Sequence, residues 1–222
     1  MNFYALQYPS DRRQNYVYGR PEWEREFPPA EWLNDRIRTG TIVCPVNPGH
    51  QRAAPRQDDL VIVLDGPHVG DFHWTWYGEC MITDRTLRLL NAAGFTGFEV
   101  RPVTVGRIKR PQSDNLKEIP RLWELIATGK GGNVSPESGI HLVSRCEGCG
   151  LVRYSSYGKG IIVDGSMWDR SDFFSVYEYP GIRLITDKVK DFILNKHLTN
   201  CMLVPSEQLR WPKGVVKPEE LR

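Results

Sequence analysis

The stretch from Arg145 to Gly150 constrains this chain more than any other, because it reads Arg-Cys-Glu-Gly-Cys-Gly. Two cysteines two residues apart, with a glycine before the second cysteine and another after it, can form one tight loop that points both sulfurs at the same ion. Such a loop supplies half of a zinc-ribbon or treble-clef site. The sequence therefore predicts a second pair of metal ligands elsewhere in the chain.

The composition is that of an ordinary globular chain, with 222 residues, 40% of them hydrophobic and 25% charged, and a net charge of +2. A charge this near zero gives no electrostatic case for nucleic acid or a membrane as an obligatory partner, so we predict neither. The chain has no apolar run of roughly 20 residues that would span a bilayer, and its start lacks the layout of a signal peptide. We expect a cytoplasmic protein whose cysteines are metal ligands or buried thiols.

Hydrophobic patterns and turn signals predict an α+β fold made of two similar units, each a small antiparallel sheet with one helix. The expected parts are an N-terminal strand and irregular covering layer (1–43), a first unit (44–103), a connector (104–143), a second unit (144–205) and a polar, peripheral tail (206–222). We expect strands at 2–8, 60–64, 71–77, 98–103, 160–163, 172–177 and 202–205. We expect helices at 83–94 and 186–194, with shorter helices at 29–38 and 120–128.

An internal duplication is indicated by six landmarks that recur in the same order. They are a cysteine knuckle, an apolar strand, an Asp-Gly turn, an Asp-Phe strand, an Ile-Thr-Asp helix start and a strand that ends in proline. Cys44 precedes Cys146 by 102 residues, and Thr83 precedes Thr186 by 103. One Ile-Thr-Asp pair would be weak, because threonine and aspartate begin many helices. The ordered set favours duplication over convergent turn and cap chemistry.

The duplication identifies candidates for the missing ligands. Cys44 takes the place of Cys146 in the first unit, and His50 is the only good zinc ligand in the turn that follows. Together with Cys146 and Cys149 they would supply three thiolates and one imidazole, which suits a closed, tetrahedral structural zinc site. Zinc bound there would contribute on the order of 10 kcal/mol to folding and tie the two halves together.

The other cysteines and histidines have more than one interpretation. The Cys146–Cys149 pair could be a redox dithiol, but the residues after it resemble a strand and not the helix N-terminus that lowers a thiol pKa. We interpret Cys80 and Cys201 as core thiols. His68 and His73 could belong to a second metal or catalytic site, or they could be surface or hydrogen-bonded histidines.

Three aspartates of the second half invite an acid/base interpretation. However, turn-forming and capping roles explain them without chemistry, and the sequence fixes no histidine or nucleophile beside them. These residues are Asp164, Asp169 and Asp172.

The cysteine motif and its surroundings resemble the double-CXXCG-motif family of bacterial immunity proteins, which are found beside contact-dependent or polymorphic toxins. The resemblance spans nearly the whole chain and is strongest from about 129 to 205. It rests on the motif Cys146–Gly150, the upstream segments Gly129–Gly132 and Pro136–Gly139, the downstream segment Trp168–Phe174, and the opening Met1–Tyr4.

The resemblance implies a cytoplasmic binding protein that protects its maker by neutralising a cognate toxin. Cys146 and Cys149 match the second motif of the family, and Cys44 matches the leading cysteine of the first. Asn47 stands where a cysteine is usual, followed by Pro48-Gly49-His50, so His50 as a ligand is an inference from this sequence alone. We expect stoichiometric inhibition without enzyme activity. A zinc-ribbon nucleic-acid-binding or regulatory module is the alternative, and an enzyme comes third.

Overall fold

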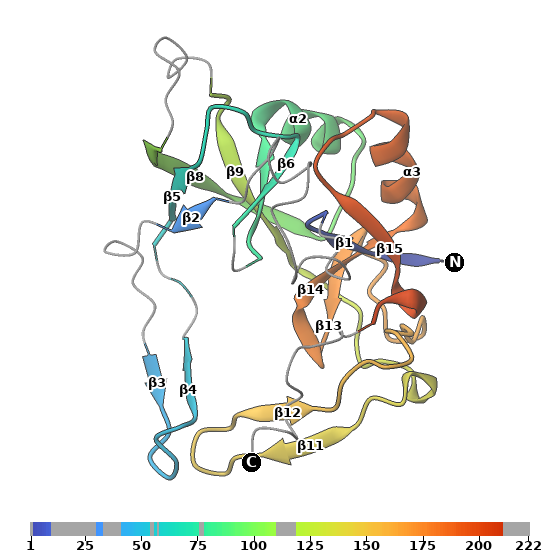
Figure 1. Ribbon diagram of the computed structural model, residues 1–222. Helices are drawn as coiled ribbons and strands as arrows, with labels where there is room; N and C mark the ends of the chain where they lie inside the picture. Colours follow the sequence, from blue (N-terminus) through green and yellow to red (C-terminus); the bar gives the residue numbers. More distant parts are fainter. Residues whose placement is uncertain are drawn as a thin grey trace, which may run out of the picture.

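The protein is described by a computed structural model that covers residues 2–9, 30–32, 41–53, 56, 58–75, 78–109 and 119–210. These residues form an α+β fold, as predicted, with two main sheets, two separate hairpins and two α-helices (Figure 1). The helices are α2 (Asp84–Ala92) and α3 (Asp187–Asn195), with short 3-10 helices η3 (Pro136–Ser138) and η4 (Ser206–Gln208). The strands are β1 (Phe3–Gln7), β2 (Glu31–Trp32), β3 (Thr41–Val43), β4 (Gln51–Ala53), β5 (Leu60–Leu64), β6 (Phe72–Trp74), β7 (Cys80–Thr83), β8 (Phe98–Ile108), β9 (Leu122–Ala127), β10 (Gly129–Lys130), β11 (Leu142–Arg145), β12 (Val152–Tyr154), β13 (Phe173–Val176), β14 (Tyr179–Thr186) and β15 (Met202–Pro205).

The two main sheets share one four-strand arrangement. The six-stranded sheet has the order β2-β5-β8-β9-β7-β6, and the five-stranded sheet has the order β10-β13-β14-β1-β15. In each, a hairpin (β6–β7 or β13–β14) leads directly into a helix, and the strand after the helix (β8 or β15) returns to the same sheet. An antiparallel strand lies between the second strand of the hairpin and the return strand. It is β9, between β7 and β8, in one sheet and β1, between β14 and β15, in the other.

The helices begin and end where their sequences indicate. Thr83 caps α2, because its hydroxyl accepts a hydrogen bond from the Thr86 amide at 3.2 Å. Gly94, with φ of +71°, ends this helix in the left-handed conformation, and His197, with φ of +51°, does the same after α3. Leu90 and Ile193 lie at matching places on the buried faces of the two helices.

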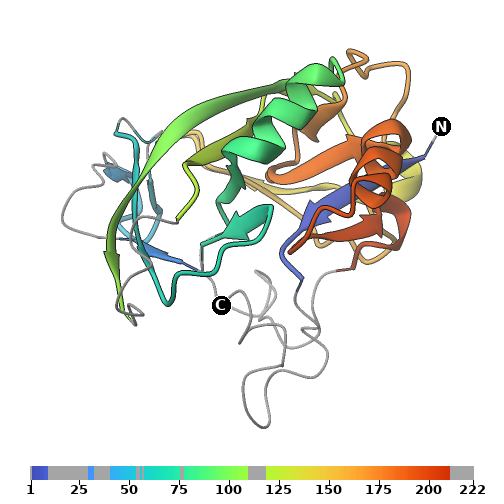
Figure 2. The same cartoon turned by 90° about the horizontal axis from the view of Figure 1, so that it is seen from above.

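One hydrophobic core joins the two halves. It contains the inward residues of both helices together with Phe72 of β6 and Phe173 of β13. The Phe95 and Phe192 rings meet edge to face, with centroids 5.1 Å apart, between the two helices. The helices α2 and α3 are neighbours in both views, and Figure 1 shows them at the end of the molecule away from the hairpins β3–β4 and β11–β12 (Figures 1 and 2). The remaining core residues form two smaller clusters, one in each half.

The expected helix at 120–128 is wrong, because residues Leu122–Ala127 form strand β9. This strand is hydrogen-bonded to β7 on one side and to β8 on the other, so it lies inside the sheet. Leu122, Glu124 and Leu125 are buried, and burial on both faces removes the alternation that marks a strand in a sequence. Tertiary pairing therefore overrides the local helix propensity.

Three other local expectations differ from the structure. Residues 160–163 form no strand; Ile161 packs in the second-half core, and Val163 makes a single bridge to Val134. The helix expected at 29–38 is wrong at Glu31–Trp32, which pair with β5, while 33–38 and most of the expected covering layer lie outside the described residues. The start of the expected peripheral tail packs in the core through Leu209.

Reciprocal hydrogen bonds join the two sheets where each hairpin begins. Asp71, before β6, accepts hydrogen bonds from the amide and hydroxyl of Thr199 at 3.0 and 3.1 Å. Asp172, before β13, accepts the same two bonds from Thr96 at 3.1 and 3.3 Å. The threonine carbonyls in turn accept from the amides of Phe72 and Phe173. Each half thus caps the loop that follows the helix of the other half.

Loss of either aspartate should destabilise the junction between the sheets. Asp172→Ala leaves the Thr96 amide and the Thr186 hydroxyl without their carboxylate acceptor, so we expect the free energy of unfolding to fall by about 1–3 kcal/mol. Asp71→Ala should cost a similar amount. Denaturant unfolding measures both, with Asp164→Ala, in an exposed turn, as the control. An equal loss in all three variants would contradict a special role for the junction.

Candidate metal centre

The four predicted ligands come from the turns of the two separate hairpins. Cys44 directly follows β3, and His50 directly precedes β4. Cys146 directly follows β11, and Cys149 lies in the turn that leads to β12. The backbone closes the second turn through hydrogen bonds from the Gly150 amide to the Cys146 carbonyl and from the Cys146 amide to the Leu151 carbonyl, at 2.7 and 2.8 Å. Each hairpin therefore presents two ligands at its tip.

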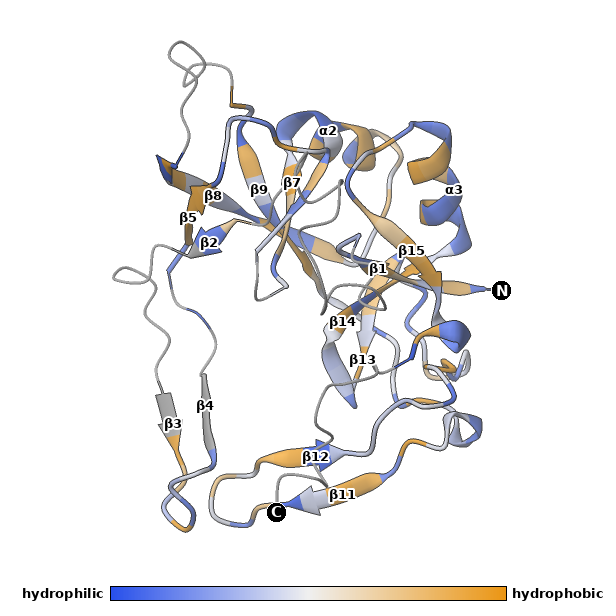
Figure 3. Ribbon diagram, in the orientation of Figure 1, coloured by the Kyte–Doolittle hydropathy of each residue, from blue (hydrophilic) through white to orange (hydrophobic). Residues whose placement is uncertain are grey.

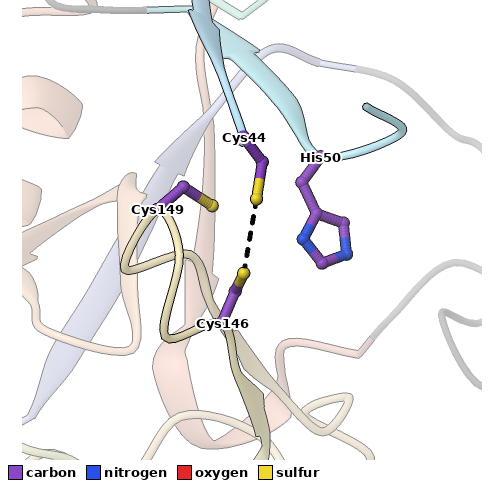
Figure 4. A group of neighbouring side chains, drawn as sticks. All are labelled: Cys44, His50, Cys146 and Cys149. Atoms are coloured by element: carbon purple, nitrogen blue, oxygen red, sulfur yellow. Dashed lines mark hydrogen bonds between the residues drawn. The ribbon is translucent and has the colours of Figure 1, made fainter. Parts of the chain in front are cut away.

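The structure brings all four side chains together. Their ligand atoms, three sulfurs and one ring nitrogen, all lie within 4.8 Å of one another. The sulfurs of Cys44 and Cys146 are 3.5 Å apart although 102 residues separate them in the chain. Figure 4 shows the three sulfurs and the imidazole facing a common centre. Cys44 is buried, and the other three are partly buried.

Backbone amides surround the sulfurs of both turns. Burial tends to raise the pKa of the Cys44 thiol, but hydrogen bonds from the Asn47 and Val46 amides outweigh it and lower the pKa. The pKa of Cys146 is lowered by the neighbouring His50 imidazole and by the amides of Cys149 and Gly148. In each turn, the two donor amides belong to the residues two and three positions after the leading cysteine. The two turns therefore prepare a thiolate in the same way.

The pKa of Cys149 moves in the opposite direction. The Leu151 amide lowers it, but burial and the neighbouring Cys44 and Cys146 thiols together raise it above the usual value. Three thiols this close repel one another once ionised. A bound cation would offset that repulsion, which is the electrostatic reason why such clusters hold metal.

The imidazole of His50 is oriented by its neighbour Asn47. Its Nε2 lies 3.2 Å from Nδ2 of Asn47, while its Nδ1 is buried and has no hydrogen-bond partner among the described residues. In Figure 4 one ring nitrogen faces the sulfurs and the other faces away. Nδ1 is thus the nitrogen available to a metal, and contact with the outer nitrogen fixes the ring.

Asn47 also explains how the first turn can do without a second cysteine. It occupies the position that Cys149 occupies in the second turn, three residues after the leading cysteine. Its side-chain oxygen accepts from the Gly49 amide at 2.9 Å, and its carbonyl accepts from the His50 amide at 2.9 Å. These bonds turn the chain so that His50 takes the open ligand position. Sequence reasoning missed this role, although an asparagine at a cysteine position followed by Pro-Gly signals a tight turn.

The two turns pack against each other at Gly148. A Cβ at this position would lie 2.5 Å from Cγ2 of Val46 and 3.4 Å from the sulfur of Cys44. A side chain at this position would displace Val46, so glycine lets the two turns approach this closely. The donor set, three thiols and one imidazole around one point, fits a tetrahedral zinc ion with no position left for substrate.

The remaining thiols and aspartates have structural roles. Burial raises the pKa of Cys80 and of Cys201 to about 12, as suits core thiols. Asp169 accepts from the Lys130 and Ser171 amides, Asp164 accepts from Ser166, and Asp172 belongs to the junction described above. Their carboxylates serve turns and connections.

His68 and His73 are not brought to the cysteine cluster. His68 is exposed, whereas His73 is 1% exposed on β6, and neither of its ring nitrogens has a hydrogen-bond partner among the described residues. Burial lowers the pKa of His73 to about 4. The prediction of a surface or hydrogen-bonded histidine is therefore wrong for His73, which is buried as a neutral ring.

Comparison with known proteins found no protein-family model and no curated protein that matches this chain. Among the described residues, no helix has both the length and the apolar character needed to cross a bilayer.

The cluster should bind one zinc ion per chain through His50 as well as the cysteines. His50→Ala removes one of four ligands, so we expect zinc affinity to fall by more than the 10–100-fold typical of losing a residue that only supports a ligand. Elemental analysis under reducing conditions and competition with a chelator measure this. His141→Ala, an exposed histidine outside the cluster, is the matched control. Full zinc occupancy and affinity in His50→Ala would remove His50 from the site.

His73 should make stability fall with pH below neutrality. Its pKa in the folded protein is about 4, against about 6.5 when unfolded, so the unfolded chain binds more protons between these values. Stability should fall by roughly 3 kcal/mol as pH drops through that window, and level off below it. His73→Leu should lack this contribution. Denaturant unfolding of the wild type and of His73→Leu from pH 7 to 4 tests this prediction, because any effect of metal on stability cancels in the difference between the two proteins. If the free energies of unfolding of the two proteins change in parallel with pH, the prediction is wrong.

Proposed function

We propose that this chain is an immunity protein that binds and neutralises a cognate bacterial toxin domain, with a zinc ion that holds its structure. The resemblance of residues 129–205 to the double-CXXCG-motif family carries the proposal. The four-ligand cluster supports it, because Cys146 and Cys149 of that motif meet Cys44 of the first turn at one point. The protein then acts by binding and covering the toxin, stoichiometrically and without chemistry of its own.

A structural role for zinc follows from the ligand set. Three thiolates and an imidazole complete the tetrahedron, whereas catalytic zinc sites keep one position for water or substrate. The three candidate acid/base aspartates are engaged in turns and in the junction between the sheets. The ion therefore fixes the hairpins β3–β4 and β11–β12 relative to each other. We place the protein in the cytoplasm, where it would bind a toxin that enters the cell.

We infer also that the two halves descend from one duplicated unit. The hairpin, helix and return strand recur in the same order in both sheets, and the Asp71–Thr199 bonds have counterparts between Asp172 and Thr96. The two turns hold their leading cysteines with amides at the same spacing. Such reciprocal contacts are those of a two-fold dimer whose copies became joined in one chain.

A zinc-ribbon module that binds nucleic acid or serves regulation is the second candidate. Exposed Arg145 and Arg153 on the β11–β12 hairpin favour it, because zinc-ribbon hairpins can present arginines to phosphates. Its signature would be binding to duplex or single-stranded DNA or RNA that weakens steeply with salt.

Co-expression should restore growth of cells that produce the cognate toxin domain, which we expect to be the variable C-terminal domain of a large secreted protein encoded by a neighbouring gene. We expect a one-to-one complex, because occlusion of one toxin domain uses one immunity surface. Growth assays and size-exclusion chromatography with light scattering measure the two outcomes. The toxin domain of an unrelated system serves as the specificity control. Absence of both protection and binding would remove the immunity function in favour of the second candidate.

A further inference from the structure

The hairpins that carry the metal ligands also carry most of the exposed apolar surface. Of the eight large hydrophobic side chains that the described part of the chain exposes, five lie on these two hairpins. We call these five the hairpin patch: Val43, Val46, Leu142, Val143 and Val152. Val46 is 74% exposed and Leu142 is 54% exposed. Figure 3 shows orange segments on β11, β12 and the turn after β3, away from the two main sheets.

The hairpin patch is one surface because the two turns touch each other. Val46 of the first turn lies against Gly148 of the second. Leu142 pairs with Tyr154 across the second hairpin and Arg145 pairs with Val152, with a register shift on β11 between Leu142 and Ser144. Leu142 and Val152 are therefore on the same face, separated by one pair of residues. Metal at the four ligands would hold this composite surface in a single geometry.

The hairpins are also left open at their edges. In the described part of the chain, β3 and β4 pair only with each other, and so do β11 and β12. A two-stranded ribbon with apolar residues exposed is only marginally stable in water, and contiguous exposed apolar residues mark interaction sites. Zinc compensates for the missing core, so the apolar side chains remain available for a partner.

The charged residues beside the hairpin patch indicate which kind of partner it would bind. Arg145 and Arg153 are exposed and form no ion pair with any described residue. Arg145, paired with Val152, shares the face of Leu142 and Val152, whereas Arg153 lies on the other face of the same hairpin. Glu147 is the only acidic residue in the segments 41–53 and 142–154, which also contain Arg52. A second copy of this chain would place arginine against arginine. A protein surface with an apolar centre and carboxylates around it matches both features.

Nucleic acid fits this surface less well. Sites for single strands use exposed aromatic rings as stacking platforms, whereas the hairpin patch consists of valines and a leucine. Tyr154 is the only aromatic residue in the two hairpins, and it is half-buried. Branched aliphatic side chains beside an arginine instead suit a protein partner.

We propose that the hairpin patch is the surface that binds the toxin domain, through an apolar contact bordered by acidic residues of the toxin. This inference rests on the proposed immunity function and specifies where it acts. The zinc ion then has a direct consequence for binding, because it aligns the two hairpins that make up the surface.

The test measures binding of the toxin domain to two double variants of the full chain. Leu142→Ser with Val152→Ser removes apolar contact and should weaken affinity about 100-fold or more. Arg145→Glu with Arg153→Glu should slow association about tenfold or more at low salt, and the difference should shrink as salt rises. Both variants should keep wild-type zinc content and melting temperature, since neither pair ligates the metal.

Matched controls carry the same changes outside the hairpin patch. Tyr177→Ser with Leu194→Ser removes exposed apolar residues of the five-stranded-sheet half, and Lys188→Glu with Lys196→Glu reverses exposed charges on or beside α3. Both should bind the toxin domain as the wild type does. If the wild type binds but the patch variants bind equally well, the patch is wrong while the immunity function stands.

Other outcomes overturn the inference differently. Wild-type protein that neither binds nor protects against the toxin domain removes the immunity function and the patch together. Salt-sensitive binding of DNA or RNA that disappears in Arg145→Glu/Arg153→Glu would assign the surface to nucleic acid. Self-association that disappears in Leu142→Ser/Val152→Ser would assign it to a second copy of the chain.

Discussion

The fold depends on the reciprocal hydrogen bonds between each Asp-Phe corner and the threonine loop of the opposite half. Asp71 binds Thr199, and Asp172 binds Thr96, so neither helix-to-strand loop is complete without the other half. Each contact is also tight: a Cβ on Gly70 would lie 2.4 Å from Cβ of Asn200, and a Cβ on Gly97 would lie 2.5 Å from Cβ of Ser171. One glycine at each contact lets the two backbones approach, and the shared core forms around them.

The metal ligands connect the same two halves a second time, at the other end of the molecule. The junction and the ligand cluster together close a long loop of chain in each half. Closing a long loop removes more conformational freedom from the unfolded chain than closing a short one. The two connections differ in kind. The junction at Asp71 and Asp172 is supported by the shared core, whereas the hairpins β3–β4 and β11–β12 have exposed faces and depend on their turns. A bound metal would therefore stabilise the hairpins more than the sheets.

Local chemistry made α2, α3 and the Cys146–Cys149 pair predictable, because caps, left-handed terminators and cysteine spacing act within a few residues. Cys44 and His50 were predicted from the landmarks that recur in the two halves. The strands that were missed or misassigned depend on distant partners. β9 is defined as a strand by its pairing with β7 and β8, and residues 160–163 fit the second core without forming a strand. Insertion of β1 and β9 into the centre of each sheet was equally hidden, since both come from outside the expected repeat units. The role of Asn47 required the geometry of the turn.

A metal placed at the exposed tips of two hairpins is poorly positioned to stabilise a core and well positioned to shape a surface. A flexible ribbon would lose conformational entropy on binding, and a surface ordered beforehand avoids that cost. Cys44, His50, Cys146 and Cys149 order both turns before any partner arrives, and Gly148 lets Val46 join the same surface. The exposed valines beside the ligands are thus costly for the isolated protein and useful for a tight complex. This combination would suit the proposed stoichiometric inhibitor, whose affinity would have to be present before it meets its partner.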